Sequence, residues 1–149
     1  IMSPTFEAAW EQGVRPYVDG EIEEKEAFER SLRPLQNFMQ KFVRDQDLKL
    51  FMDIANIPPV ATPNDIPAKV LIPAFIISEL RRAFEIGFLV FIPFLVIDMV
   101  VASVLMSMGM MMLPPIIIAL PFKIIFFVLV DGWFLIVGSL VQSFGALGP

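Results

Sequence analysis

Two long apolar runs separated by a Pro-Pro pair dominate the second half of this chain of 149 residues. The first run spans residues 86–113 and has one charged residue in 28. As a helix it would be about 42 Å long, more than the roughly 30 Å hydrocarbon core of a bilayer. The second run spans residues 116–141 and has two charged residues. Because Pro114 and Pro115 cannot continue a helix, the sequence predicts an apolar helical hairpin that turns at this pair.

The first half of the chain is chemically different. Residues 1–69 carry 12 of the 16 acidic and 8 of the 11 basic residues. The whole chain is 56% hydrophobic, above the 45–50% that is usual for soluble domains, and its net charge of −5 argues against nucleic-acid binding. The chain has no cysteine and no histidine, which removes thiol nucleophiles, disulfides and the usual zinc and haem ligands. We therefore expect none of these sites, and no metal or other cofactor, in the chain.

Short amphipathic helices are expected before the apolar runs. Between Glu23 and Arg44 the apolar side chains recur at spacings of three and four residues, which is typical of one helix face. Pro34 should end or kink this helix near Arg33.

A second short helix is expected over residues 47–55, with Asp45 or Asp47 as its N-cap. Residues 56–67 contain four prolines and no periodicity, which is typical of a loop. Residues 68–85 are predicted to be helical again and lead directly into the first apolar run.

The predicted fold class is therefore all-α and membrane-associated, with short helices followed by a long kinked helix and the apolar hairpin. We divide the chain into a helical segment (residues 1–67), a hairpin region (68–144) and a tail of unknown origin (145–149). Because the chain starts at Ile1, without a charged region and an apolar stretch of the signal-peptide kind, we expect upstream residues in the natural protein.

Three ionisable residues lie within the apolar runs, where charges are costly and are candidates for function: Asp98, Lys123 and Asp131. In a straight hairpin centred between Pro114 and Pro115, the two carboxylates lie at the same depth, about 25 Å from the turn and near the far rim of a membrane. We interpret them as rim carboxylates that make contacts between helices or subunits. An intramembrane aspartyl protease dyad is disfavoured, because Asp131 stands in a Val-Asp-Gly sequence and not in Gly-x-Gly-Asp.

Lys123 would lie near the middle of the apolar layer, where a lysine without a partner is strongly disfavoured. We expect it to pair between subunits, with Glu79 as the first choice and Asp98 as the second. An alternative function remains open, in which Asp98, Lys123 and Asp131 form a relay in a proton-coupled or small-solute carrier subunit.

Six methionines crowd residues 99–112, and the last three are consecutive: Met110, Met111 and Met112. Methionine is flexible and adapts to changing shapes. If several copies surrounded an axis, this triplet would form a soft apolar collar that blocks ions and yields to a passing chain. The alternative is ordinary core or lipid-facing packing.

Long stretches of the sequence resemble the FliP family. FIPFLVIDMVVASVLMSMGMMMLPP and ALPFKIIFFVLVDGWFLIVGSLVQSF are similar to its C-terminal half, and IMSP, RPLQNFM, LFMDIAN and LIPAFIISELRRAFEIGF resemble its upstream part. The resemblance covers residues 1–144. FliP is a flagellar biosynthesis protein and a core subunit of the flagellar type III export gate, with relatives in the injectisomes of virulence systems.

The resemblance implies a pore-forming, non-enzymatic subunit that translocates unfolded flagellar proteins across the bacterial inner membrane. About five copies would assemble with FliQ and FliR in the flagellar basal body, near FlhB and other export proteins. Much of this channel would stand above the bilayer plane, and residues 1–67 would be periplasmic. The family's pore gasket maps onto Met110, Met111 and Met112, and its charged contacts between subunits map onto Glu79 and Lys123.

Overall fold

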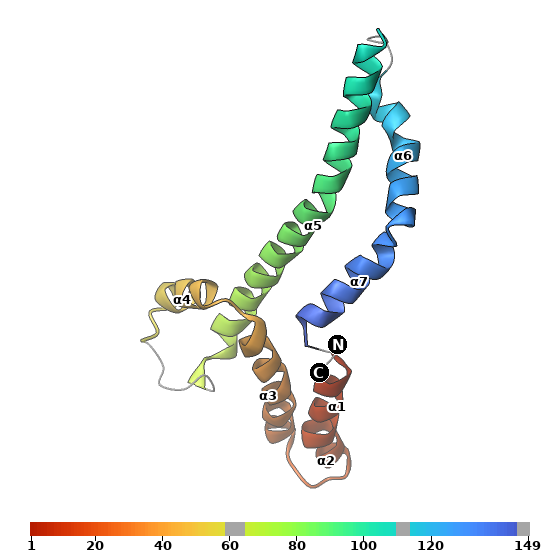
Figure 1. Ribbon diagram of the computed structural model, residues 1–149. Coiled ribbons are helices and arrows are strands. Elements are labelled where there is room, and N and C mark those ends of the chain that lie inside the picture. The colour runs from red at the N-terminus through yellow and green to blue at the C-terminus, as the bar shows by residue number, and fades with distance from the viewer. Residues whose placement is uncertain (59–64, 110–113, 146–149) are drawn as a thin grey trace. The chain divides into compact units, whose positions relative to one another are not determined.

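The computed structural model describes residues 1–58, 65–109 and 114–145, and its regular elements there are all helical (Figure 1). They are α1 (Ser3–Ala9), the π-helix η1 (Trp10–Val14), α2 (Arg15–Val18), α3 (Glu24–Phe42), α4 (Asp45–Ile54), α5 (Ala68–Ser107), α6 (Pro115–Leu129) and α7 (Gly132–Ser143). The prediction of an all-α chain is confirmed. The chain divides within α5 into two compact units, Met2–Ala83 and a second unit from Phe84 onward.

The π-helical turn η1 brings α1 and α2 close to α3 in the first unit. Gly13 lies in this turn and is buried. A Cβ atom at this position would collide with Ser31 Oγ and would lie 2.6 Å from the carbonyl oxygen of Ala27. The helices can therefore approach this closely only because the residue is glycine.

α3 differs from the sequence prediction at Pro34. The helix begins with Glu24 and Glu26 in its first turn, where negative charge interacts favourably with the helix dipole. It then continues through Pro34 and ends only at Phe42. A proline inside a helix removes one backbone hydrogen bond, and packing of α1 and η1 along α3 compensates for this loss.

α4 starts slightly earlier than predicted, and its N-cap is Arg44. The two aspartates expected at the cap, Asp45 and Asp47, instead occupy the first turn of the helix. Arg44 has an extended backbone, and Val43 before it is extended as well. These two residues are the whole connection between α3 and α4.

The first part of α5 supplies the core of the first unit. Its buried residues lie on one helix face, and they are Val70, Leu71, Ala74 and Ser78. Beside them, Phe75 meets Phe38 of α3 edge-on, with 6.1 Å between the ring centres. α5 continues without interruption through Pro73 and Pro93, although each proline removes one backbone hydrogen bond of the helix.

The second unit buries few side chains. Within its described part, the buried residues are Leu105, Ala119 and Gly132, while most large apolar side chains of α5, α6 and α7 are exposed. α5 is long and apolar enough to cross a membrane, and α6 with α7 would be a second, bent span. This is the pattern of a membrane-associated protein, whose apolar surface faces lipid or other chains.

The hairpin differs from the prediction in two places. α5 already ends at Ser107, because Gly109 adopts a left-handed φ of +76°, a common helix terminator. α5 therefore ends several residues before the proline pair, and α6 begins at Pro115. The second apolar run, predicted as one helical arm, is broken after Leu129, where α7 turns away from α6 by 58°.

Candidate functional site

An ion pair joins α5 to α6 within the apolar hairpin. Lys123 Nζ lies 2.8 Å from Asp98 Oδ1, and only 19% and 26% of the two side chains are exposed. Asp98 lies nine residues before the end of α5, and Lys123 lies eight residues after the start of α6. Residues at similar distances from a turn lie opposite each other on antiparallel helices. The position of the turn therefore brings these two residues together.

Apolar side chains surround the lysine end of this pair. A groove of about 540 Å³ runs past Lys123, and its other lining residues are Val90, Phe94, Leu120, Ile124, Phe127, Val128, Trp133 and Ile136. An unpaired ammonium group is costly in such surroundings, so the carboxylate of Asp98 stabilises it. The 2.8 Å separation between Lys123 Nζ and Asp98 Oδ1 is typical of a charge-assisted contact.

This pairing changes the expected placement of the charged residues. The straight hairpin put Asp98 opposite Asp131, which is wrong: Lys123 lies there, because the turn comes earlier than expected. Within the chain Lys123 pairs with Asp98, the second of its two expected partners. The first, Glu79, has its Oε1 atom 3.4 Å from Arg82 Nη1 on the same helix. Contacts of Lys123 and Glu79 between subunits, and the position of the carboxylates at a membrane rim, remain predictions.

Asp131 lies at the break between α6 and α7. Its backbone is left-handed, with φ +56°. Gly132 after it is buried against the ring of Phe127, with which an added Cβ would collide. The rings of Phe127 and Trp133 meet edge to face, with 5.2 Å between their centres. Asp131 therefore marks a sharp change of helix direction.

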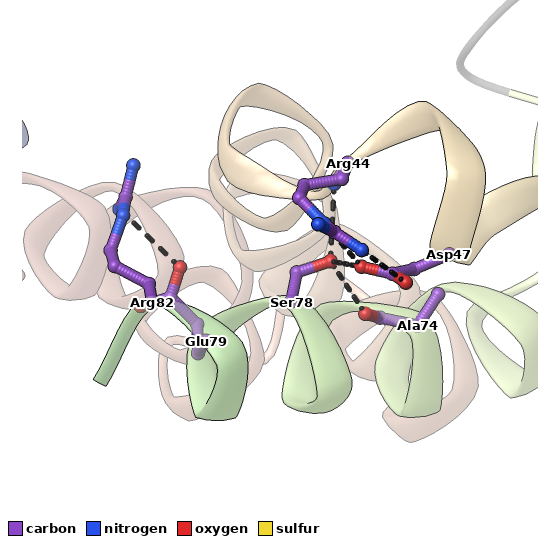
Figure 2. A network of polar contacts seen from close by, with 6 residues as sticks. All are labelled: Arg44, Asp47, Ala74, Ser78, Glu79 and Arg82. Carbon is purple, nitrogen blue, oxygen red and sulfur yellow. Dashed lines mark hydrogen bonds and ion pairs between the residues drawn. The ribbon is translucent and has the colours of Figure 1, made fainter. Parts of the chain in front are cut away.

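A second polar cluster, which the sequence analysis missed, attaches the α3–α4 corner to α5 (Figure 2). The Arg44 guanidinium donates two hydrogen bonds of 2.8 Å, one to each carboxylate oxygen of Asp47. The Ser78 hydroxyl lies 2.7 Å from Asp47 Oδ2 and accepts a 3.1 Å hydrogen bond from the backbone N–H of Arg44. It also lies 2.9 Å from the Ala74 carbonyl oxygen. The hydroxyl has one proton, which goes to the charged and closer Asp47.

Electrostatics favour the charged form of Asp47 in this cluster. Hydrogen bonds from Arg44 and then from Ser78 lower the pKa of Asp47 from its ordinary 3.8 to about 2, although burial acts in the opposite direction. Next to the cluster, the Arg82 guanidinium lies 5.8 Å from the centre of the Phe42 ring. The sequence contained one clue: Ser78 is the only polar side chain between residues 70 and 78.

The predicted pore gasket, Met110, Met111 and Met112, lies outside the described residues. Nearby methionines that are described, Met99, Met106 and Met108, are exposed. Across residues 1–58, 65–109 and 114–145, no three acidic side chains are close enough together to hold a metal ion.

Comparisons with known proteins agree on one family. Residues 1–140 match the profile of the FliP family. The chain is 60% identical over 144 residues to the flagellar biosynthetic protein FliP of Caulobacter vibrioides, a match that covers 97% of this chain and 54% of the relative. The FliP protein of Agrobacterium fabrum is 57% identical over 146 residues, covering 97% and 60%. That of Bacillus subtilis is 56% identical over 144 residues, covering 97% and 65%. The chain thus spans between half and two thirds of the length of these relatives.

Proposed function

The chain belongs to the FliP family of flagellar biosynthesis proteins, and from this membership we propose that it is part of a pore-forming, non-enzymatic subunit of the flagellar type III export gate. The complete protein would translocate unfolded flagellar subunits across the bacterial inner membrane. About five copies would form the channel with FliQ and FliR, in contact with FlhB and other export proteins of the basal body. Residues 1–67 would face the periplasm.

The exposed apolar surface of α5, α6 and α7 is the observation that supports this proposal most. Phe88, Met99, Ile116 and Leu129 are among the large side chains that are more than 60% exposed. Such a surface is stable only when lipid or other protein chains cover it. A subunit that packs side by side with copies of itself in a channel has this requirement.

The ion pair supports the same proposal over the carrier alternative. A relay requires groups that exchange protons along a path. Asp98 and Lys123 already neutralise each other, and Asp131 lies eight residues beyond Lys123, about 12 Å along the chain. Among the described residues Asp131 forms no ion pair with Lys123. We propose that the pair stabilises the hairpin for assembly.

Native mass spectrometry of the full-length protein, co-expressed with FliQ and FliR in mild detergent, tests the assembly. We expect a complex of about five copies that carries the smaller subunits. A monomer or a simple dimer, under conditions that preserve other membrane complexes, would contradict the proposal and favour the carrier.

A leak measurement tests the gasket. In the assembled complex in liposomes, replacing Met110, Met111 and Met112 by alanine should raise the resting ion flux, because smaller side chains leave the axis open to water. The matched control replaces three other methionines, Met99, Met106 and Met108, which preserves the number of changes. Equal leak in the two triple variants would remove the gasket from the mechanism.

A further inference from the structure

The break between α6 and α7 (Figure 1) carries costs that a continuous helix would not have. Asp131 adopts a left-handed conformation, with φ +56° and ψ +45°, which L-amino acids disfavour. Its side chain makes no capping hydrogen bond to α7 among the described residues. The first N–H groups of α7 therefore lack the partner that an N-cap aspartate usually supplies.

One aromatic contact stabilises the bend. Phe127 covers buried Gly132 and packs edge to face on Trp133. These residues follow Phe127 by five and six positions. On an uninterrupted helix only residues three and four positions apart are neighbours. The contact of Phe127 with Gly132 and Trp133 therefore belongs to the bent form.

The sequence is also compatible with a straight form. No proline lies between Pro121 and Ser143. A continuous helix would pair the N–H groups of Gly132, Trp133 and Phe134 with the carbonyl groups four residues earlier. In apolar surroundings each unpaired N–H group is costly, so a membrane or an apolar protein interface favours this pairing. The continuous helix is disfavoured in turn because it loses the contact of Phe127 with Gly132 and Trp133.

We propose that residues 130–132 are a hinge with two states. In the bent state, the contacts of Phe127 with Gly132 and Trp133 hold α7 at an angle to α6. In the straight state, residues 115–143 form one helix and this contact is lost. The hinge follows from the local geometry of this chain and does not depend on the export function.

Substitutions at the hinge should move the two states in opposite directions. Gly132→Ala adds a Cβ that collides with the Phe127 ring only in the bent state. Asp131→Leu makes the left-handed conformation less favourable and the helix more favourable. Asp131→Gly accepts a positive φ and weakens the helix, so it favours the bent state. Gly138→Ala is the matched control in α7, because its added Cβ meets nothing within 4 Å.

Pulsed electron spin resonance can measure the two states in the full-length protein in lipid nanodiscs. Spin labels are placed by Ile117→Cys and Ser143→Cys, which is straightforward because these 149 residues contain no cysteine. Dilution with unlabelled protein keeps one labelled copy in each assembly. A straight helix separates the two backbone positions by about 39 Å, and the 58° bend shortens this distance by about 5 Å.

We expect both distances in the unsubstituted protein. The population at the longer distance should rise about threefold or more in Gly132→Ala and Asp131→Leu, fall in Asp131→Gly and stay unchanged in Gly138→Ala. If Gly132→Ala does not fold, Asp131→Leu provides the same test. A single distance in the unsubstituted protein, or an equal change in Gly138→Ala, would overturn the hinge.

Discussion

Single polar atoms determine how the α3–α4 corner meets α5. Ser78 Oγ is hydrogen-bonded to both the backbone N–H of Arg44 and the carboxylate of Asp47. Without this hydroxyl, two groups in a largely buried cluster lose a partner at once. An unsatisfied buried polar group costs about 1–3 kcal/mol.

Ser78→Ala should therefore destabilise the attachment of α4 by about 1–2 kcal/mol. Hydrogen exchange of the amides in residues 45–54, followed by mass spectrometry, should become about tenfold faster. The control is Ser103→Ala, because the Ser103 hydroxyl is exposed and donates to the Met99 carbonyl of its own helix. The same exchange in both variants would show that the hydroxyl of Ser78 is not what holds the corner.

The attachment of α4 should also depend on acid. Because the pKa of Asp47 is lower in the folded protein than its ordinary 3.8, its carboxylate contributes stability above about pH 4. This contribution is lost as the pH falls from about 4 towards 2, where the carboxylate is protonated. Protection factors of the α4 amides, corrected for intrinsic exchange, should fall over this range. Asp47→Asn should start with less protection and lose less of it as the pH falls. If this variant lost as much protection between about pH 4 and pH 2 as the unsubstituted protein, Asp47 would not have this role.

At the scale of helices, a close crossing fixes the first unit. Gly13→Ala should destabilise the packing of η1 on α3 by about 1–3 kcal/mol, because the added methyl group collides with Ser31 and Ala27. The rate of trypsin cleavage after Lys25 and Arg30 in native conditions should then rise at least about fivefold. Gly87→Ala is the control, since its Cβ would meet nothing within 4 Å. Equal cleavage rates in the two variants would rule out this crossing as the constraint.

Helices were easier to predict than their ends. The spacing of apolar residues predicts α3, and the long uncharged run predicts the apolar part of α5, because both signals extend over many residues. The end of α5 depends on one residue, Gly109. The sequence analysis placed the turn at the more conspicuous proline pair instead. The break before α7 lies at an Asp-Gly pair, a turn signal that is easily missed within an apolar run.

The functional residues themselves were likewise easier to predict than the contacts they make. The three charges of the hairpin stand out in the sequence, but their relative depths depend on the turn, so an error of a few residues placed Asp98 opposite Asp131 and not opposite Lys123. The polar cluster joins Ser78 to Asp47 and Arg44, which lie 31 and 34 positions earlier, and local patterns do not show which distant residues Ser78 contacts.

At the scale of the whole molecule, the hairpin combines an exposed apolar surface with an internally neutralised charge. Lys123→Met leaves the carboxylate of Asp98 without its partner, and we expect it to disrupt assembly. A fully buried pair costs about 3–5 kcal/mol when broken; this one should cost less, because 19% of the Lys123 side chain and 26% of the Asp98 side chain are exposed. Native mass spectrometry should show fewer complete complexes.

The double variant Asp98→Asn with Lys123→Met tests whether assembly is lost because a charge is unpaired or because the lysine side chain is missing. It should recover part of the assembly that Lys123→Met loses, because no charge remains unpaired. If Asp98→Asn alone assembled fully yet abolished transport, the residue would act in a carrier mechanism.

The ion pair also has a consequence for biosynthesis. Asp98 leaves the ribosome 25 residues before Lys123, which corresponds to about one to five seconds of translation. During this interval α5 carries an acidic group without its counter-ion, which opposes entry into the hydrocarbon layer. We therefore expect the insertion machinery to retain α5 until α6 has emerged, so that both helices enter the bilayer together. A chain that stops before Lys123 should integrate poorly.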